Sequence, residues 1–134
     1  MSLQLSVAVR NARLDAIETQ VGTSAVLKLR TGAPPANCAA ADSGTVLCSQ
    51  TLPVDWLNNA SGGTKTILGS WAGTGAAAGT IGHFRIYDSG GTVCGIQGTV
   101  TATGGGGDMT FDNIVVAVSQ AISEVTFTLT DANA

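Results

Sequence analysis

The chain has 134 residues, the length of one domain, and nearly half of them are Gly, Ala, Ser or Thr. Only 11% are charged, against about 25% in ordinary soluble domains, and the net charge is −3 with scattered basic residues. These figures argue against a nucleic-acid-binding surface, and no apolar run approaches the roughly 18 residues of a membrane span. We also expect no signal peptide, because residues 1–9 lack a basic start and a cleavage-like site.

Residues 1–22 are predicted to form an arm and one short helix. Leu14, Ile17 and Val21 recur at helical spacing, and Gly22 is a natural terminator for a helix of about ten residues. Before them, the apolar residues of 3–9 alternate with a period of two, which is typical of an extended segment. Either the helix caps an open end of the rest of the domain, or the arm lies on another subunit.

Residues 23–134 are predicted to form seven to eight short antiparallel strands separated by turns. Spacings of 8–12 residues between strands predict an all-β fold of the β-sandwich or jelly-roll type, as one structural domain with the helix. Residues 72–79 and 104–107 are read as loops, the second as a flexible hairpin tip. The expected strands are 25–31, 45–52, 64–71, 80–88, 92–101, 109–111, 114–118 and 122–130.

The strand over 80–88 has the clearest pattern. Phe84 and Ile86 share one face, and His83, Arg85 and Tyr87 share the other. The same reasoning places Val125, Phe127 and Leu129 inward on the last strand.

No residue set predicts catalysis, and we expect no cofactor, no metal and no small-molecule substrate. His83 is the sole histidine and has no nucleophile motif beside it, so we expect it to face solvent or a neighbouring subunit. The glycines of 104–107 lack the Lys-Ser/Thr of a phosphate-binding loop. Asp108, Asp112 and Asn113 lack calcium-loop spacing, and Asp112-Asn113 is more simply a turn.

Cys38 and Cys48 bracket a loop of small residues, so a disulfide that closes this loop is one possibility. Synthesis in a reducing cytosol argues for free thiols, and the sequence leaves the redox state open. Cys94 is read as a small core residue.

Trp56 and Trp71 have two interpretations. Exposed together on a sheet, they would stack on sugar rings, as in a carbohydrate-binding module. Alternatively, each fills the core or an interface, which is the more common place for a tryptophan in a small domain.

Four segments together resemble a group of small structural proteins of tailed bacteriophages and prophages. The resemblance covers nearly the whole chain, and it rests on strand and turn signatures and on no catalytic residues. The segments are 9–17 (VRNARLDAI), 27–35 (LKLRTGAPP), 83–93 (HFRIYDSGGTV) and 125–133 (VTFTLTDAN).

The resemblance implies a capsid decoration, or cement, protein that binds the major capsid protein and itself, as a dimer or trimer, on virions assembled in the host cytoplasm. A tail component (tube, fibre module or head–tail connector) is the alternative, and an enzyme is not expected. The loop at 104–107 and an arm-and-loop set are the expected contact regions. The residues of that set are Leu3, Leu5, Val7, Arg10, Arg13, Pro34 and Pro35.

Overall fold

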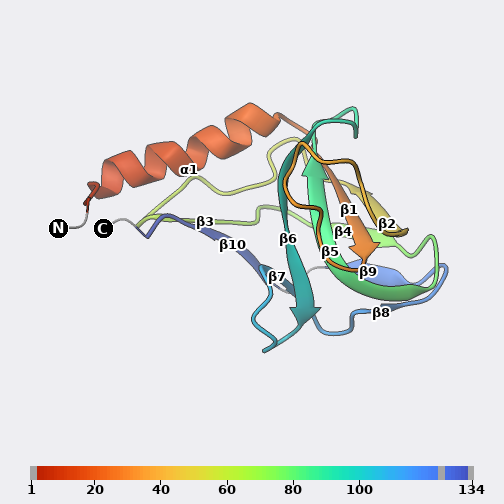
Figure 1. Cartoon of the computed structure of the whole chain (residues 1–134). Helices are drawn as coiled ribbons and strands as arrows, with labels where there is room; N and C mark the ends of the chain where they lie inside the picture. Colours follow the sequence, from red (N-terminus) through yellow and green to blue (C-terminus); the bar gives the residue numbers. More distant parts are fainter. Residues whose placement is uncertain (1–2, 124–125, 133–134) are drawn as a thin grey trace.

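The computed structural model describes residues 3–123 and 126–132 and is mostly β, with 41% of residues in strands (Figure 1). The described part contains one helix and ten strands. In chain order they are α1 (Val7–Val21), β1 (Val26–Thr31), β2 (Val46–Thr51), β3 (Thr64–Thr66), β4 (Ala72–Thr74), β5 (Gly79–Tyr87), β6 (Cys94–Ala102), β7 (Met109–Phe111), β8 (Val115–Val116), β9 (Ala121–Ser123) and β10 (Thr126–Thr130).

Eight strands form one mixed sheet in the order β2-β1-β5-β6-β7-β10-β3, with β8 paired to the start of β5. A separate two-stranded sheet joins β4 and β9. All these pairs are antiparallel except β6–β7, which is parallel. The expectation of antiparallel strands throughout is therefore wrong at this pair.

The four glycines at 104–107 explain how β6 and β7 can be parallel with so short a connection. Parallel neighbours ordinarily need a crossover of about a dozen residues or more. Here the chain turns back onto Thr101, and a Cβ at Gly105 or Gly107 would lie within 2.8 Å of a Thr101 atom. Gly104 and Gly106 take φ values of 86° and 82°, which favour glycine. The segment is a tightly packed reversal, and the predicted hairpin tip is wrong.

The β1–β5 pair has an apolar face and a polar face, as the alternation in 80–88 predicts. Leu27, Leu29, Phe84 and Ile86 are fully buried on the apolar face, where each contributes about 1.5–3 kcal/mol to folding. Phe84 packs edge-on against Phe127, with ring centroids 5.4 Å apart.

The polar face of β5 is buried as well. His83, Arg85 and Tyr87 are each 2% exposed or less. The expectation that His83 faces solvent or a neighbouring subunit is therefore wrong. Its Nδ1 lies 2.8 Å from the carbonyl oxygen of Gly32, which begins the loop that covers this face.

Helix α1 begins earlier than predicted. Ser6 caps it by accepting a hydrogen bond from the backbone N–H of Val9 at 3.3 Å, so Val7 and Val9 are helical. The extended arm is therefore limited to residues 3–6. The end of the helix is as predicted: Gly22 has a φ of 98°, and its N–H donates to the Glu18 carbonyl.

Several strand boundaries also differ. The predicted strand 64–71 shortens to β3, and residues 72–79, read as a loop, contain β4. The segment 122–130 is divided between β9 and β10, and Phe127 is buried as predicted. Val125, also expected to point inward, lies outside the described residues.

Candidate functional site

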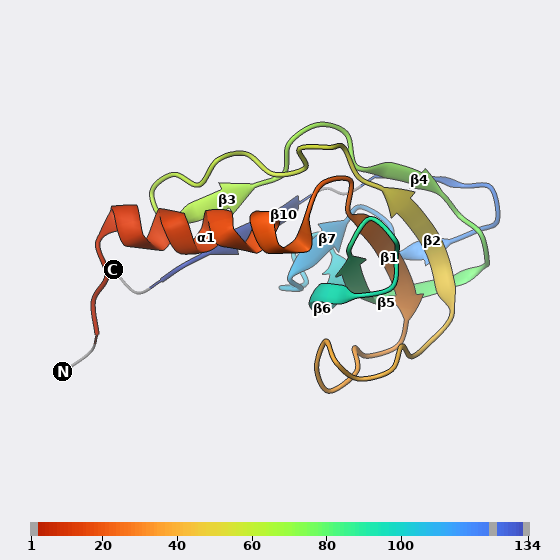
Figure 2. The same ribbon diagram turned by 90° about the horizontal axis from the view of Figure 1, so that it is seen from above.

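Two features outside the apolar core organise the surfaces that the sequence singled out. The first is α1, which lies alongside β3 and β10, to one side of the β1–β5–β6 region (Figures 1 and 2). Within the described chain, Leu14 is the one helix residue that is fully buried. Polar contacts, more than apolar packing, therefore hold the helix in place.

Lys65 of β3 lies at the centre of these contacts. Its side chain is 1% exposed, and its Nζ lies 2.7 Å from Asp15 Oδ1 and 3.0 Å from Glu18 Oε2. Nζ also donates to the Asn58 carbonyl at 2.9 Å. Burial alone would lower the pKa of Lys65, but the hydrogen bonds to Asp15 and Glu18 outweigh it and raise the pKa. The ammonium is therefore held charged beneath the helix.

The carboxylates of the helix also satisfy the backbone of residues 56–60. Glu18 Oε1 accepts the N–H groups of Trp56 and Leu57 at 3.1 and 3.0 Å, and Asp15 Oδ1 accepts that of Ala60 at 2.9 Å. The Trp56 indole N–H donates to the carbonyl of Gly22, just after the helix. The carboxylates of Asp15 and Glu18, the Trp56 indole and the Lys65 ammonium together fix the position and the rotation of α1.

Arg10 and Arg13, predicted to contact another subunit, hold the helix to the residue that follows β10. Arg10 Nη1 donates to the Asp131 carbonyl at 3.0 Å, and Arg13 Nη1 lies 3.1 Å from Asp131 Oδ2. Gly63 favours glycine here, because its φ is 79° and a Cβ, 2.2 Å from Arg10 Nη1, would displace the guanidinium. The Arg13 side chain remains 55% exposed, so it alone of the two stays substantially open to solvent.

The first turn of α1 and the arm before it present apolar side chains to solvent. Leu3 is 77% exposed, Val7 48% and Val9 46%, and Leu5 is half-buried. Farther along, α1 and the β5–β6 turn enclose a groove of about 670 Å³, whose lining includes Ile17.

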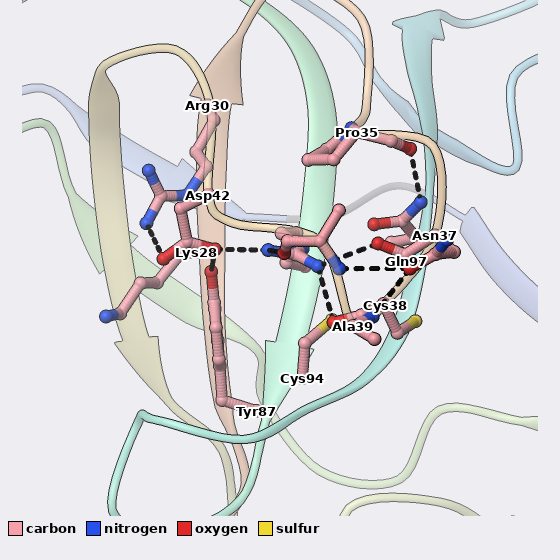
Figure 3. A network of polar contacts seen from close by, with 12 residues as sticks. Lys28, Arg30, Pro35, Asn37, Cys38, Ala39, Asp42, Tyr87, Cys94 and Gln97 are labelled. Carbon is pink, nitrogen blue, oxygen red and sulfur yellow. Dashed lines mark hydrogen bonds and ion pairs between the residues drawn. The ribbon is translucent and has the colours of Figure 1, made fainter.

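The second feature is the loop at 32–44, which lies over the polar face of β1 and β5 (Figure 3). Asp42 ties this loop to the sheet. Its Oδ2 accepts from Arg30 of β1 at 2.9 Å, and its Oδ1 accepts from Arg85 and from the Tyr87 hydroxyl. Burial would raise the pKa of Asp42, but the hydrogen bonds from Tyr87 and Arg85 and the charge of Arg30 lower it. Burial and the bond to Asp42 raise the pKa of Tyr87.

Arg85 extends the same network along the loop. Its guanidinium donates to the carbonyls of Ala40 at 3.2 Å, Asn37 at 3.2 Å and Cys38 at 2.8 Å (Figure 3). An arginine that is 2% exposed therefore satisfies three loop carbonyls and one carboxylate. The loop is built as a fixed cover over β5.

Pro34 and Pro35, the predicted contact residues of this loop, are half-buried. The Pro35 carbonyl accepts a hydrogen bond from the Gln97 side chain of β6 at 2.7 Å. The structure thus places the prolines in one fixed loop. It does not bring them together with the arm, which belongs to the α1 side of the molecule (Figure 2).

The structure does not favour the Cys38–Cys48 disulfide that the sequence left as one possibility. All three cysteines are present as thiols. Cys48 is fully buried and pairs in register with Leu29, which points into the apolar core, whereas Cys38 lies on the loop over the opposite face. The sheet therefore separates these two side chains. Cys94, read as a core residue, is only half-buried and lines the same depression as Cys38.

Trp56 and Trp71 are core residues, 0% and 3% exposed, with ring centroids 5.9 Å apart. The interpretation that they fill the core is confirmed. The carbohydrate-binding alternative needs exposed rings and loses its basis.

The acidic residues considered for calcium have structural partners. Asp108 Oδ2 accepts from both the backbone and the hydroxyl of Thr99, and Asn113 Oδ1 caps the backbone N–H of Val115, as expected of a turn. In residues 3–123 and 126–132, no three His, Cys, Asp or Glu side chains gather as metal ligands do. Over the same residues, the helix is too short and polar to cross a membrane.

Comparisons with known proteins give no match: no family model, curated protein or solved structure resembles this chain significantly. The arrangement of side chains must therefore carry the functional argument. Sequence reasoning missed Lys65 and Asp42, the residues that fix the helix and the loop. A usable signal was present, because four of the six basic residues of the chain lie inside predicted strands.

Proposed function

We propose that this protein is a structural subunit of a tailed-bacteriophage or prophage particle, most specifically a decoration protein of the outer capsid. The resemblance of four segments to such proteins is the first support. The second support is the structure itself, in which ion pairs of Lys65 fix helix α1 and ion pairs of Asp42 fix the loop at 32–44.

The observation that carries the proposal is the combination of a rigid anchor with an exposed apolar end. Lys65, buried beneath α1, holds the helix by two carboxylates, while Leu3, Val7 and Val9 extend apolar surface beyond that anchor. Apolar side chains presented on a fixed element are the usual core of a protein–protein contact. A subunit that must fit one joint of a shell needs such an element at a defined angle.

The partners in this proposal are the major capsid protein and other copies of the chain, as a dimer or trimer at a local symmetry axis of the virion. A β-sandwich or jelly roll belongs to the same proposal. It is supported by the second sheet, β4–β9, whose Ile122 shares one core with Leu47 and Phe127 of the larger sheet.

The experiment is co-expression of the chain with the major capsid protein encoded nearest to its gene, followed by purification of the shells. Mass spectrometry of intact shells gives the copy number of the chain. We expect hundreds of copies per shell, and loss of most of them when Leu3, Val7 and Val9 are replaced by Gln.

The matched control replaces Val115 and Val118 by Gln. They are also exposed valines, at 58% and 63%, but lie in the segment around β8, away from α1. Shells without the chain, or unchanged binding of the arm variant, would refute the proposal. A handful of copies in complete particles, or rings of the purified protein in electron micrographs, would indicate a tail component instead.

A further inference from the structure

Cys38 and Cys94 meet at one place on the surface. Cys38 belongs to the loop at 32–44, and Cys94 is the first residue of β6. Both are half-buried, and both line a depression of about 640 Å³ together with Asp42, Arg85 and Tyr87. Figure 3 shows the two side chains on the same side of the sheet, at the edge of the network of polar contacts.

The backbone at both cysteines is fixed. The Cys38 carbonyl accepts from Arg85 at 2.8 Å. Asn37 Oδ1 accepts the backbone N–H groups of Ala39 and Ala40 at 3.0 Å each, which defines the turn. Cys94 pairs in register with Tyr87, so its side chain belongs to the polar face of the sheet. The loop therefore presents Cys38 to β6 without needing to refold.

The Cys38 thiol also affects the pKa of Cys94. The pKa of Cys94 is raised to about 11, first by burial and next by a hydrogen bond with the Cys38 thiol. Groups that interact in this way are neighbours in space. Cys48 lies in the apolar core on the other side of the sheet.

We propose that Cys38 and Cys94 form an intramolecular disulfide under oxidising conditions, and that this bond locks the loop at 32–44 onto β6. The oxidant is a small-molecule disulfide such as oxidised glutathione. The Cys38 thiolate attacks one sulfur of the oxidant, which gives a mixed disulfide and releases one thiol. Cys94 then loses its proton and attacks the Cys38 sulfur, which forms the protein disulfide and releases the second thiol.

The bond would join two points separated by fifty-five residues, and so would restrict the unfolded chain strongly. The inference stands without the proposed function, because it concerns two groups of one chain. The proposed function would also supply the oxidising conditions, because a particle assembled in a reducing cytoplasm is released into an oxidising medium.

The test uses the reduced full-length protein, equilibrated with oxidised glutathione and then treated with an alkylating reagent. Trypsin alone leaves Cys38 and Cys48 in one peptide, because no Lys or Arg lies between them. A second protease that cleaves before Asp separates them at Asp42. We expect the non-reducing digest to contain one linked pair, Cys38 with Cys94, lighter by two hydrogens, with Cys48 alkylated after unfolding.

The linked pair should disappear in Cys38→Ser and persist in Cys48→Ala, the matched control. Oxidation should raise the midpoint of thermal unfolding of the wild-type protein by about 5–10 °C, and dithiothreitol should reverse the rise. A link that includes Cys48, a link between two copies of the chain, or complete alkylation of Cys38 and Cys94 after oxidation would each overturn the proposal. Because purified protein is used, these outcomes are independent of binding to any shell.

Discussion

Replacing Lys65 by Met tests whether an ionic anchor holds α1. The ammonium is 1% exposed and serves two carboxylates and one carbonyl. Loss of one partner of a fully buried ion pair costs about 3–5 kcal/mol. Here the carboxylates are not fully buried, since the side chains of Asp15 and Glu18 are 46% and 17% exposed. Water can hydrate them in part, so we expect a loss of about 2–3 kcal/mol in the free energy of unfolding.

Variants of the two carboxylates sharpen this prediction. Glu18→Ala removes one ion pair and also leaves two backbone N–H groups, of Trp56 and Leu57, without their acceptor. We expect it to cost about 2 kcal/mol. Asp15→Asn changes a more exposed partner and keeps an acceptor oxygen for Ala60, so it should cost about 0.5 kcal/mol.

Urea unfolding followed by circular dichroism measures all three variants, with the slope of the transition as a check that unfolding stays two-state. The expected order of destabilisation is Lys65→Met, then Glu18→Ala, then Asp15→Asn. A cost below about 0.5 kcal/mol for Lys65→Met would show that the helix is held by other contacts. Equal costs for Glu18→Ala and Asp15→Asn would refute the role given to the backbone N–H groups.

Other predictions concern the loop, acid stability and the glycine reversal. Asp42→Ala should destabilise the protein by about 2–3 kcal/mol in urea, less than for a fully buried pair because the Asp42 side chain is 39% exposed; a negligible cost would contradict the anchoring of the loop. Folding lowers the pKa values of Asp15 and Asp42 from 3.8. The two carboxylates therefore stabilise the folded protein above about pH 4, and this stabilisation is lost as the pH falls through the lowered pKa values. Unfolding midpoints that stay constant down to pH 2 would contradict this. Gly105→Ala should reduce the free energy of unfolding by about 1–3 kcal/mol, because its Cβ would clash with Thr101. Gly90→Ala is the control: its Cβ would have no atom nearer than 3.7 Å, and the change should stay below about 0.5 kcal/mol. Equal shifts of the thermal unfolding midpoint for the two variants would argue against a packed reversal.

Local patterns in the sequence predicted those features that depend on neighbours along the chain. The alternation in 80–88 correctly placed Phe84 and Ile86 on one face and His83, Arg85 and Tyr87 on the other. Side chains of a strand alternate between faces wherever the strand lies. Gly22 ends the helix as expected, since the residue after a helix favours a positive φ. The burial of Trp56 and Trp71 followed from their size in a chain of small residues.

Features that depend on distant partners were missed or misread. Arg85 has the pattern of an exposed strand residue, yet it is buried because a loop more than forty residues away supplies Asp42 and three carbonyls. For Cys38, the sequence suggested only the nearer cysteine, Cys48, as a possible disulfide partner. No local pattern shows that the sheet separates them.

Residue types and their spacing were enough to specify a mostly β chain with one N-terminal helix and a core that includes both tryptophans. These features follow from residue type and spacing, which act over one turn of helix or one pair of strand positions. Four features became visible only in the folded chain: the parallel β6–β7 pair, the anchoring of α1 on Lys65, the loop held by Asp42, and the meeting of Cys38 with Cys94. Each of these joins residues far apart in sequence, and its stability comes from burial and charge pairing that exist only after the chain has folded.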